Sequence, residues 1–117
     1  MKNISKNLQM FNQVYKETNV IYHDYAAKNG ISDTAFWIMY SVYYYGEGIT
    51  QKNICEEWFY SAQTVNSSLK TMEKNGLIIL EPSKGNKKEK QIRFTKEGQL
   101  LAEKIIKPVI EAEKQSF

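Results

Sequence analysis

The stretch "ITQKNICEEWFYSAQTVNSSLKTMEKNGL", residues 49–77, decides the fold class of this chain. Thr50 is a good N-cap for a short helix, and Ser61 is a good N-cap for a second helix that ends near Gly76. Two aromatic residues between the helices form the expected turn. A short helix, a tight turn and a capped second helix make a helix-turn-helix unit.

The second of these helices has two faces of different chemistry. Val65, Leu69 and Met72 recur at i, i+4 and i+7 and are expected to face the core. The outward positions carry short neutral polar side chains instead of the usual Glu and Lys. Gln63 and Asn66 stand among them, and their amides can pair with adenine in a bidentate way. This face is a candidate for meeting base edges in DNA, with an ordinary solvated face as the alternative.

A β-hairpin with a basic tip is expected next. Residues 77–81 (LIILE) are predicted to form a strand of buried type, and residues 91–95 (QIRFT) alternate as in a half-buried strand. Residues 84–96 hold six basic residues against one acid, a net +5, whereas the rest of the chain has 10 basic and 12 acidic residues, a net −2. Adding this hairpin to a helix-turn-helix makes a winged helix, whose lysines are placed to neutralise phosphates. A lysine-rich tip that only aids solubility is the alternative.

Helices are also expected on both sides of this unit. In residues 4–25, apolar and aromatic residues recur at spacings of four and three, which places them along one helical seam. Thr95 caps a last helix, which Pro108 should kink or restart. The apolar stripe of that helix is expected at Leu101, Ile105, Val109 and Ala112.

The expected fold class is therefore mainly α (α+β), a winged helix-turn-helix with a two-stranded β wing. We expect the winged helix at residues 31–95, with helical segments at residues 1–30 and 96–117 on either side.

Composition bounds the function classes. The chain has 117 residues, enough for one domain. It has no apolar run long enough to span a bilayer and no secretory signal, so the cytoplasm is the expected location. His23 is the only histidine, and no catalytic constellation appears, so no enzyme activity, cofactor or metal is expected. Cys55 is interpreted as an inert core thiol, with a redox switch as the alternative.

From about residue 30 to residue 101 the chain resembles the MarR family of bacterial winged-helix transcriptional regulators. The resemblance is carried by four pieces in order: "GIS" with a following Phe, "ITQKNICEEW" with "SAQTV", "LKTMEKNGLI", and "NKKEKQIRFTKEGQLL". It implies a homodimer built from dimerisation helices at residues 1–30 and 96–117. This dimer would act on double-stranded DNA as a sequence-specific regulator, and specifically as a repressor on a pseudopalindromic operator. Recognition helices would enter successive major grooves, wings would reach minor grooves, and a small-molecule or redox signal would release the protein.

Helical geometry assigns roles to the outward residues. Gln63 and Asn66 are expected to contact bases, and Ala62 to meet a thymine methyl group. The expected phosphate contacts are Ser61, Thr64, Ser67, Lys70, Gln51 and Lys52, together with the wing residues Lys84, Lys87, Lys88 and Lys90.

The first helices are rich in aromatic residues, most of which should be core or dimer contacts. In the MarR-like arrangement a groove near the DNA-binding unit holds effectors, so a small aromatic or apolar effector is the expected ligand. The candidate lining residues are Tyr15, Tyr22, Tyr25, Trp37 and Tyr40.

A second function class stays open. The family wing commonly has an Asp and an Arg two residues apart, where this chain has Asn86 and Lys88, and Ser67 stands where the family often has a basic residue. These residues favour, as the alternative, a winged-helix module that binds a protein, or a regulator that has lost strong DNA binding.

Overall fold

The computed structural model describes residues 20–46, 48–83 and 85–115. The expected seam therefore lies mostly outside the described residues, as do Tyr15 and Lys84. The chain divides into two compact units, residues 1–33 and residues 34–117, and each is considered by itself. In the described part of the chain, no helix has the length and apolar character needed to cross a membrane.

In the first unit, residues 20–28 are helical and end in a glycine stop. Gly30 adopts a φ of 77°, the left-handed conformation that glycine accepts without strain. The amide of Ile31 donates to the carbonyl of Ala26, and the amide of Gly30 donates to the carbonyl of Ala27, both at 3.0 Å. This pair of bonds is a Schellman motif, which ends the helix at Asn29-Gly30.

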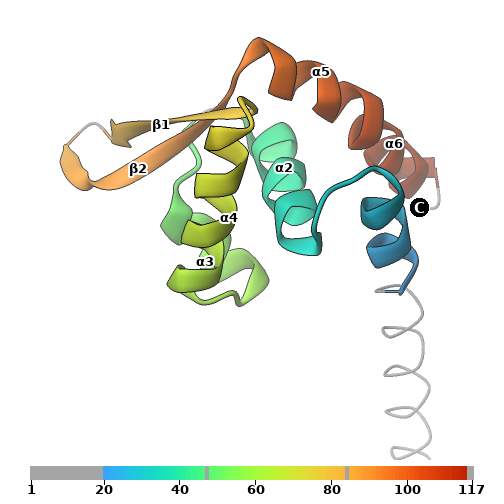
Figure 1. Cartoon of the computed structure of the whole chain (residues 1–117), viewed down its shortest axis with the longest axis horizontal. Helices are drawn as coiled ribbons and strands as arrows, with labels where there is room; N and C mark the ends of the chain where they lie inside the picture. Colours follow the sequence, from blue (N-terminus) through green and yellow to red (C-terminus); the bar gives the residue numbers. More distant parts are fainter. Residues whose placement is uncertain (1–19, 47, 84, 116–117) are drawn as a thin grey trace, which may run out of the picture. The chain divides into compact units, whose positions relative to one another are not determined.

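The second unit contains the winged helix (Figure 1). Its elements are, in order, α2 (Asp33–Tyr45, which begins at the unit boundary), α3 (Gln51–Trp58), α4 (Ala62–Lys74), β1 (Ile78–Ser83), β2 (Asn86–Phe94), α5 (Lys96–Ile105) and α6 (Lys107–Gln115). The two strands pair antiparallel in a two-stranded sheet. The predicted fold class is thereby confirmed.

Both helices of the helix-turn-helix begin at the predicted caps. The hydroxyl of Thr50 accepts from the amide of Asn53 at 3.2 Å, and the Asn53 side chain accepts from the amide of Thr50 at 2.9 Å, a complete capping box. The hydroxyl of Ser61 accepts from the amide of Thr64 at 3.1 Å. Between them, Phe59 ends α3 with a φ of 56°, a left-handed conformation that is unfavourable for a residue with a Cβ.

Apolar residues from every helix and both strands build the core of the second unit. Val65 and Leu69 are 0% exposed and Met72 is 2% exposed, as their spacing predicts. The other fully buried large side chains include Phe36, Ile38, Met39, Ile54, Ile78, Ile92, Ile105 and Ile106. α4 is therefore held firmly along one face.

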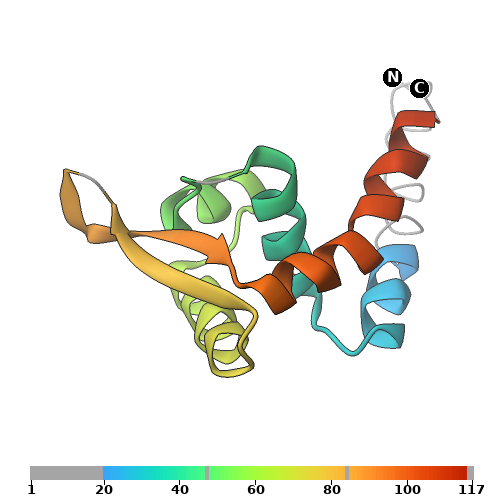
Figure 2. The same cartoon turned by 90° about the horizontal axis from the view of Figure 1, so that it is seen from above.

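The hairpin differs from the prediction in length and in its turn (Figure 2). The segment from Pro82 to Lys90 was expected to be a loop, but β1 continues through Ser83 and β2 starts at Asn86. Ser83 pairs with Asn86, and the register shifts after the Pro82–Lys90 pair, so that β2 bulges there. Proline is tolerated because each strand of a two-stranded sheet is an edge strand. The first strand is also less buried than predicted, since Ile79 is 44% exposed.

A short segment before α3 adds to the wing. Thr50 forms an isolated antiparallel bridge with Gln91, and the amide of Ile92 donates to the carbonyl of Ile49 at 2.9 Å. The bridge ties the start of α3 to the base of the wing.

The last helix is broken as Pro108 predicts, but its buried stripe is different. α5 ends at Ile105 and α6 begins at Lys107. Proline lacks the amide proton that a continuous helix would need at this point, and the first turn of a new helix tolerates it. The buried residues are Gly98, Ala102, Ile105, Ile106 and Ile110, whereas Leu101 and Val109 are only half-buried and Ala112 is exposed. The expected stripe was wrong except at Ile105, because it carried the spacing of one regular helix across the break at Ile106.

Candidate nucleic-acid interface

The outward face of α4 is as polar and accessible as its sequence predicts. Ser61, Ala62, Gln63, Thr64, Asn66, Ser67 and Lys70 are all exposed. Because the opposite side of the helix is fully buried, packing sets the direction in which Gln63 and Asn66 point. These amides stand in the first two turns, the part of a recognition helix that meets base edges.

The hydroxyl groups at the start of α4 bond to each other. The hydroxyl of Ser61 donates to that of Thr64 at 2.8 Å, in addition to capping the helix. Both residues remain exposed beside the positive end of the helix dipole, where an anion is favoured. A phosphate contact here would come from the helix N-terminus and these hydroxyls together.

Gln51 has a structural contact that the sequence did not suggest. Its side-chain amide donates to the carbonyl of Ala62 at 3.1 Å and so joins the start of α3 to the start of α4. Gln51 therefore helps to hold α4 in place through this bond. Its neighbour Lys52 is exposed in the first turn of α3.

The wing presents less free positive charge than its sequence suggests. Lys90 is exposed, and Lys87 and Lys88 lie on β2 next to the register shift. Arg93 donates to Glu81 across the two strands at 3.2 Å, and both side chains are more than 40% exposed. An exposed pair of this kind stabilises the wing little, but it offsets the charge of the wing's one arginine.

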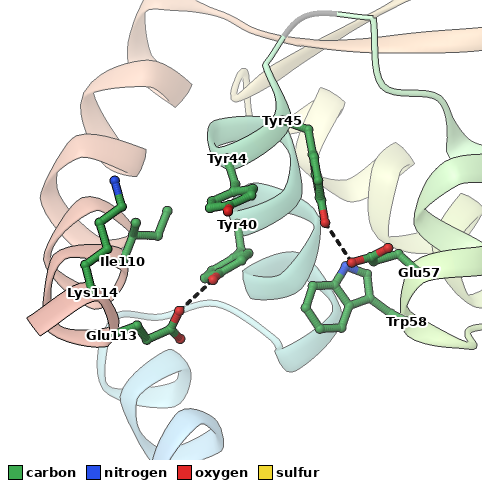
Figure 3. Close-up of a pocket in the computed structure, with 8 residues that line it drawn as sticks. All are labelled: Tyr40, Tyr44, Tyr45, Glu57, Trp58, Ile110, Glu113 and Lys114. Atoms are coloured by element: carbon green, nitrogen blue, oxygen red, sulfur yellow. Dashed lines mark hydrogen bonds between the residues drawn. The ribbon is translucent and has the colours of Figure 1, made fainter. Parts of the chain in front are cut away.

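A cleft lies beside the helix-turn-helix (Figure 3). We call it the aromatic cleft; it measures about 520 Å³ and is lined by Tyr40, Tyr44, Tyr45, Glu57, Trp58, Ile110, Glu113 and Lys114. Of the described residues expected to line an effector pocket, Tyr40 does so. Tyr22 and Tyr25 belong to the first unit. Trp37 is not one of the lining residues, although its ring is stacked on that of Trp58 with centroids 4.5 Å apart.

Two tyrosines of the aromatic cleft donate to carboxylates. The hydroxyl of Tyr40 donates to Glu113 at 2.6 Å, and that of Tyr45 donates to Glu57 at 2.8 Å. The bond to Glu57 raises the pKa of Tyr45 above its ordinary value, so the phenol stays neutral at physiological pH. Sequence reasoning missed both glutamates. The i, i+3, i+4 spacing of Ile110, Glu113 and Lys114 was the available signal that they share a helix face.

The remaining candidate side chains do not form a reactive or metal site. Cys55 is half-buried, and burial raises the pKa of its thiol, which keeps it protonated and unreactive. His23 is exposed and lies 2.8 Å from Asp33; the hydrogen bond to that carboxylate raises the pKa of the imidazole. Over the residues that the structure describes, no three His, Cys, Asp or Glu side chains are grouped to hold a metal ion.

Solved structures share this fold. A MarR family regulator from Neisseria meningitidis is 21% identical with a TM-score of 0.76, over 95% of this chain and 78% of that one. Reduced AbfR bound to DNA is 19% identical with a TM-score of 0.70, over 99% and 95% of the two chains. A MepR mutant from S. aureus bound to an oligodeoxyribonucleotide is 20% identical with a TM-score of 0.67, over 93% and 80%. A search of curated proteins gave no significant match.

The sequence model of the MarR family matches residues 29–89, from the end of the first described helix to the wing. The match covers 61 of 117 residues, just over half of the chain, and includes the whole helix-turn-helix. With the winged-helix architecture, it shows that the chain belongs to the MarR family of transcriptional regulators.

Proposed function

We propose that this chain is a homodimeric repressor that binds a pseudopalindromic operator and leaves it when a small molecule binds. The two-sided α4 carries the proposal: exposed Gln63 and Asn66 stand opposite the fully buried Val65 and Leu69. Such packing holds the two amides in fixed directions, which direct readout of bases requires. The relatives AbfR and MepR, whose structures contain DNA, support the proposal by analogy.

The exposed residues divide into those that contact bases and those that contact phosphates. Gln63 and Asn66 read base edges in the major groove, and Ala62 meets a thymine methyl group. Ser67 and Lys70 hold phosphates from one side of α4, and Lys52 and the wing lysines hold them from the other elements. Amides supply the sequence information, and the lysines supply attraction that is independent of sequence.

The dimer is part of the proposal. Residues 1–30 and 96–117 would join two copies so that their α4 helices enter successive major grooves about 34–36 Å apart. Light scattering on the full chain should give twice the mass of 13.6 kDa. A monomer at the highest attainable concentration would contradict the dimer.

Selecting bound sequences from a pool of random duplexes tests the central proposal. The expected result is an enriched pseudopalindrome, whose affinity for the protein falls with salt at a log–log slope near −0.9 per neutralised phosphate. Absence of any DNA affinity at low salt would refute the proposal.

Two variants with matched controls assign the roles. Gln63→Ala should lose discrimination of about 1–3 kcal/mol at one base pair of the half-site, whereas Gln99→Ala, at an exposed glutamine of α5, should not. Lys90→Ala should weaken binding to all sequences alike and reduce the salt slope by about one. Lys74→Ala, at an exposed lysine in the last turn of α4, is the charge control.

One observation favours a second candidate function. Arg93 is paired with Glu81, so the one arginine of the wing binds a carboxylate of its own sheet. A winged helix that binds a protein partner fits such a wing. Retention of a stoichiometric protein partner in a pull-down without DNA would favour this candidate over the repressor.

A further inference from the structure

We propose that the aromatic cleft binds an organic cation, a protonated amine or quaternary ammonium group carried on a flat apolar body. The inference rests on the proposed function, because it names the chemical class of the effector. It extends the expectation of an aromatic or apolar effector by adding a positive charge. Binding to the cleft is measurable without DNA, so it can be tested separately from operator binding.

The size of the cleft suits a small organic molecule. Its volume of about 520 Å³ lies within the usual range for ligand pockets, about 300–1,000 Å³. Ile110 is 7% exposed and supplies an apolar surface on α6. The rest of the lining combines aromatic rings with charged groups at Glu57, Glu113 and Lys114, which can orient a ligand.

The aromatic rings of the cleft lie in two nearly perpendicular orientations. Tyr40 and Tyr44 are stacked with centroids 6.0 Å apart and planes 11° from parallel. Trp58 is 6.0 Å from Tyr40 at 88°, so its plane is nearly perpendicular to theirs. The indole nitrogen of Trp58 donates to the hydroxyl of Ser41 at 2.6 Å, which fixes the ring. An ammonium group within about 6 Å of such rings is attracted by their quadrupoles, most strongly by tryptophan.

The charges of the cleft select the sign of the ligand. Glu57 and Glu113 each accept from a tyrosine, and because a phenol is neutral, these bonds orient the carboxylates without cancelling their charge. Lys114 is the one basic residue of the lining, so the net charge of the eight lining residues is −1. A cation is therefore attracted and an aromatic carboxylate is repelled.

The position of the cleft connects it to the recognition helix. Its residues come from α2, from the end of α3 and from α6 (Figure 3). Glu57 and Trp58 are the last two residues of α3, directly before the turn at Phe59 that leads into α4. A cation bound here contacts both the helix-turn-helix and the C-terminal helix. The bound cation weakens operator binding if it favours an arrangement of these helices that does not fit the operator.

Benzyltrimethylammonium chloride is a suitable probe, titrated into the full chain without DNA at constant ionic strength. Calorimetry and tryptophan fluorescence should show saturable binding, with quenching at Trp58. Glu57→Gln and Glu113→Gln should each weaken binding by about five- to tenfold, since each removes one charge next to the ammonium. Glu111→Gln, at an exposed glutamate of the same helix α6 outside the lining, should leave binding unchanged.

Two further measurements distinguish a lost binding site from a misfolded variant. Lys114→Gln should strengthen cation binding, a gain that a damaged protein would not show. Sodium benzoate should bind more weakly than the cation to the unchanged protein. Tighter binding of benzoate, or equal affinities of the Glu57, Glu113 and Glu111 variants for the cation, would overturn the inference.

The failures of the two proposals are distinguishable. Loss of operator binding on adding the cation, reduced in Glu113→Gln, is the expected regulatory result. Operator binding without cation binding would overturn this inference alone. Saturable cation binding by a chain with no DNA affinity would overturn the repressor and the effector role together, while the binding site itself would stand.

Discussion

Replacing Gly98 by alanine is expected to destabilise the chain by about 2–3 kcal/mol, although glycine to alanine inside a helix ordinarily stabilises by about 1 kcal/mol. Gly98 lies in the first turn of α5 against the segment that links α4 to β1. A Cβ atom there would overlap the carbonyl oxygen of Leu77, and would lie 2.9 Å from the carbonyl carbon and 3.1 Å from Cδ1 of Phe94. Because the obstacle is backbone, a side-chain rotation cannot relieve it.

The cost follows from the bonds that must break when α5 moves away. The amide of Thr95 donates to the carbonyl of Leu77 at 3.0 Å, and its hydroxyl donates to the carbonyl of Gly76 at 2.6 Å. Each such bond contributes about 1 kcal/mol, and each carbonyl left buried without a partner costs about 1–3 kcal/mol. These losses exceed the gain in helix propensity.

Urea unfolding at a fixed protein concentration, followed by tryptophan fluorescence, measures this effect. With a slope of about 1–3 kcal/mol/M, the midpoint should fall by about 0.7–3 M. Leu100→Ala is the control, because Leu100 is 57% exposed on the same helix and should change stability by less than about 1 kcal/mol. An unchanged or higher midpoint for Gly98→Ala would contradict the overlap between a Cβ atom at this position and the Leu77 carbonyl.

Three more changes test single features of the structure. Phe59→Gly should raise the free energy of unfolding by about 1 kcal/mol, because glycine adopts the left-handed conformation of this residue without the strain that a Cβ causes. The side chain that is lost is 93% exposed, so little packing is lost with it. A lower free energy of unfolding would contradict this prediction. An NMR titration should find the pKa of His23 above its ordinary value of 6.5, and Asp33→Asn should lower it. Since the folded pKa is raised, this pair stabilises below pH 6.5 and its contribution is lost as pH rises through the raised value; equal titrations of the two proteins would refute it. Cys55 should react with iodoacetamide more slowly in the native chain than in urea, because burial raises the pKa of its thiol; equal rates would restore the redox alternative.

Local signals predicted the recognition helix well. Its cap at Ser61, its glycine stop and its buried face depend on neighbours within a few residues, which periodicity and capping rules capture. The hairpin was predicted too short because Pro82 and the lysines signal a loop by residue type, whereas hydrogen bonding between the two strands continues almost to the turn.

The aromatic cleft could not be assembled from the sequence. Glu57 and Glu113 lie on different helices far apart in the chain, and only the packing of α3 and α6 on α2 brings them to one cleft. The sequence identified the aromatic residues as a group, because they are concentrated in one region. It could not separate Trp37, which stacks on Trp58 outside the lining, from Tyr40, which lines the cleft.

The contacts of the second unit indicate where an effector would act. The Thr50–Gln91 bridge ties α3 to the wing, the Gln51 side chain ties it to α4, and Thr95 ties the end of α4 to α5. The proposed DNA-reading surface, made of α3, α4 and the wing, is therefore held together with α5 as one body. α6 is joined to that body at Ile106, where Pro108 prevents a continuous helix.

A cation between α3 and α6 is thus expected to change the angle at Ile106 and leave the shape of the reading surface unchanged. In a symmetric dimer joined through its C-terminal helices, such a change alters the spacing of the two recognition helices, which the operator fixes. Spin labels at exposed positions of α3 and α6, such as Glu56 and Glu111, should report a changed distance when benzyltrimethylammonium binds. Labels at Lys70 of α4 and Lys90 of β2 should not, and a change there would mean that the ligand deforms the reading surface itself.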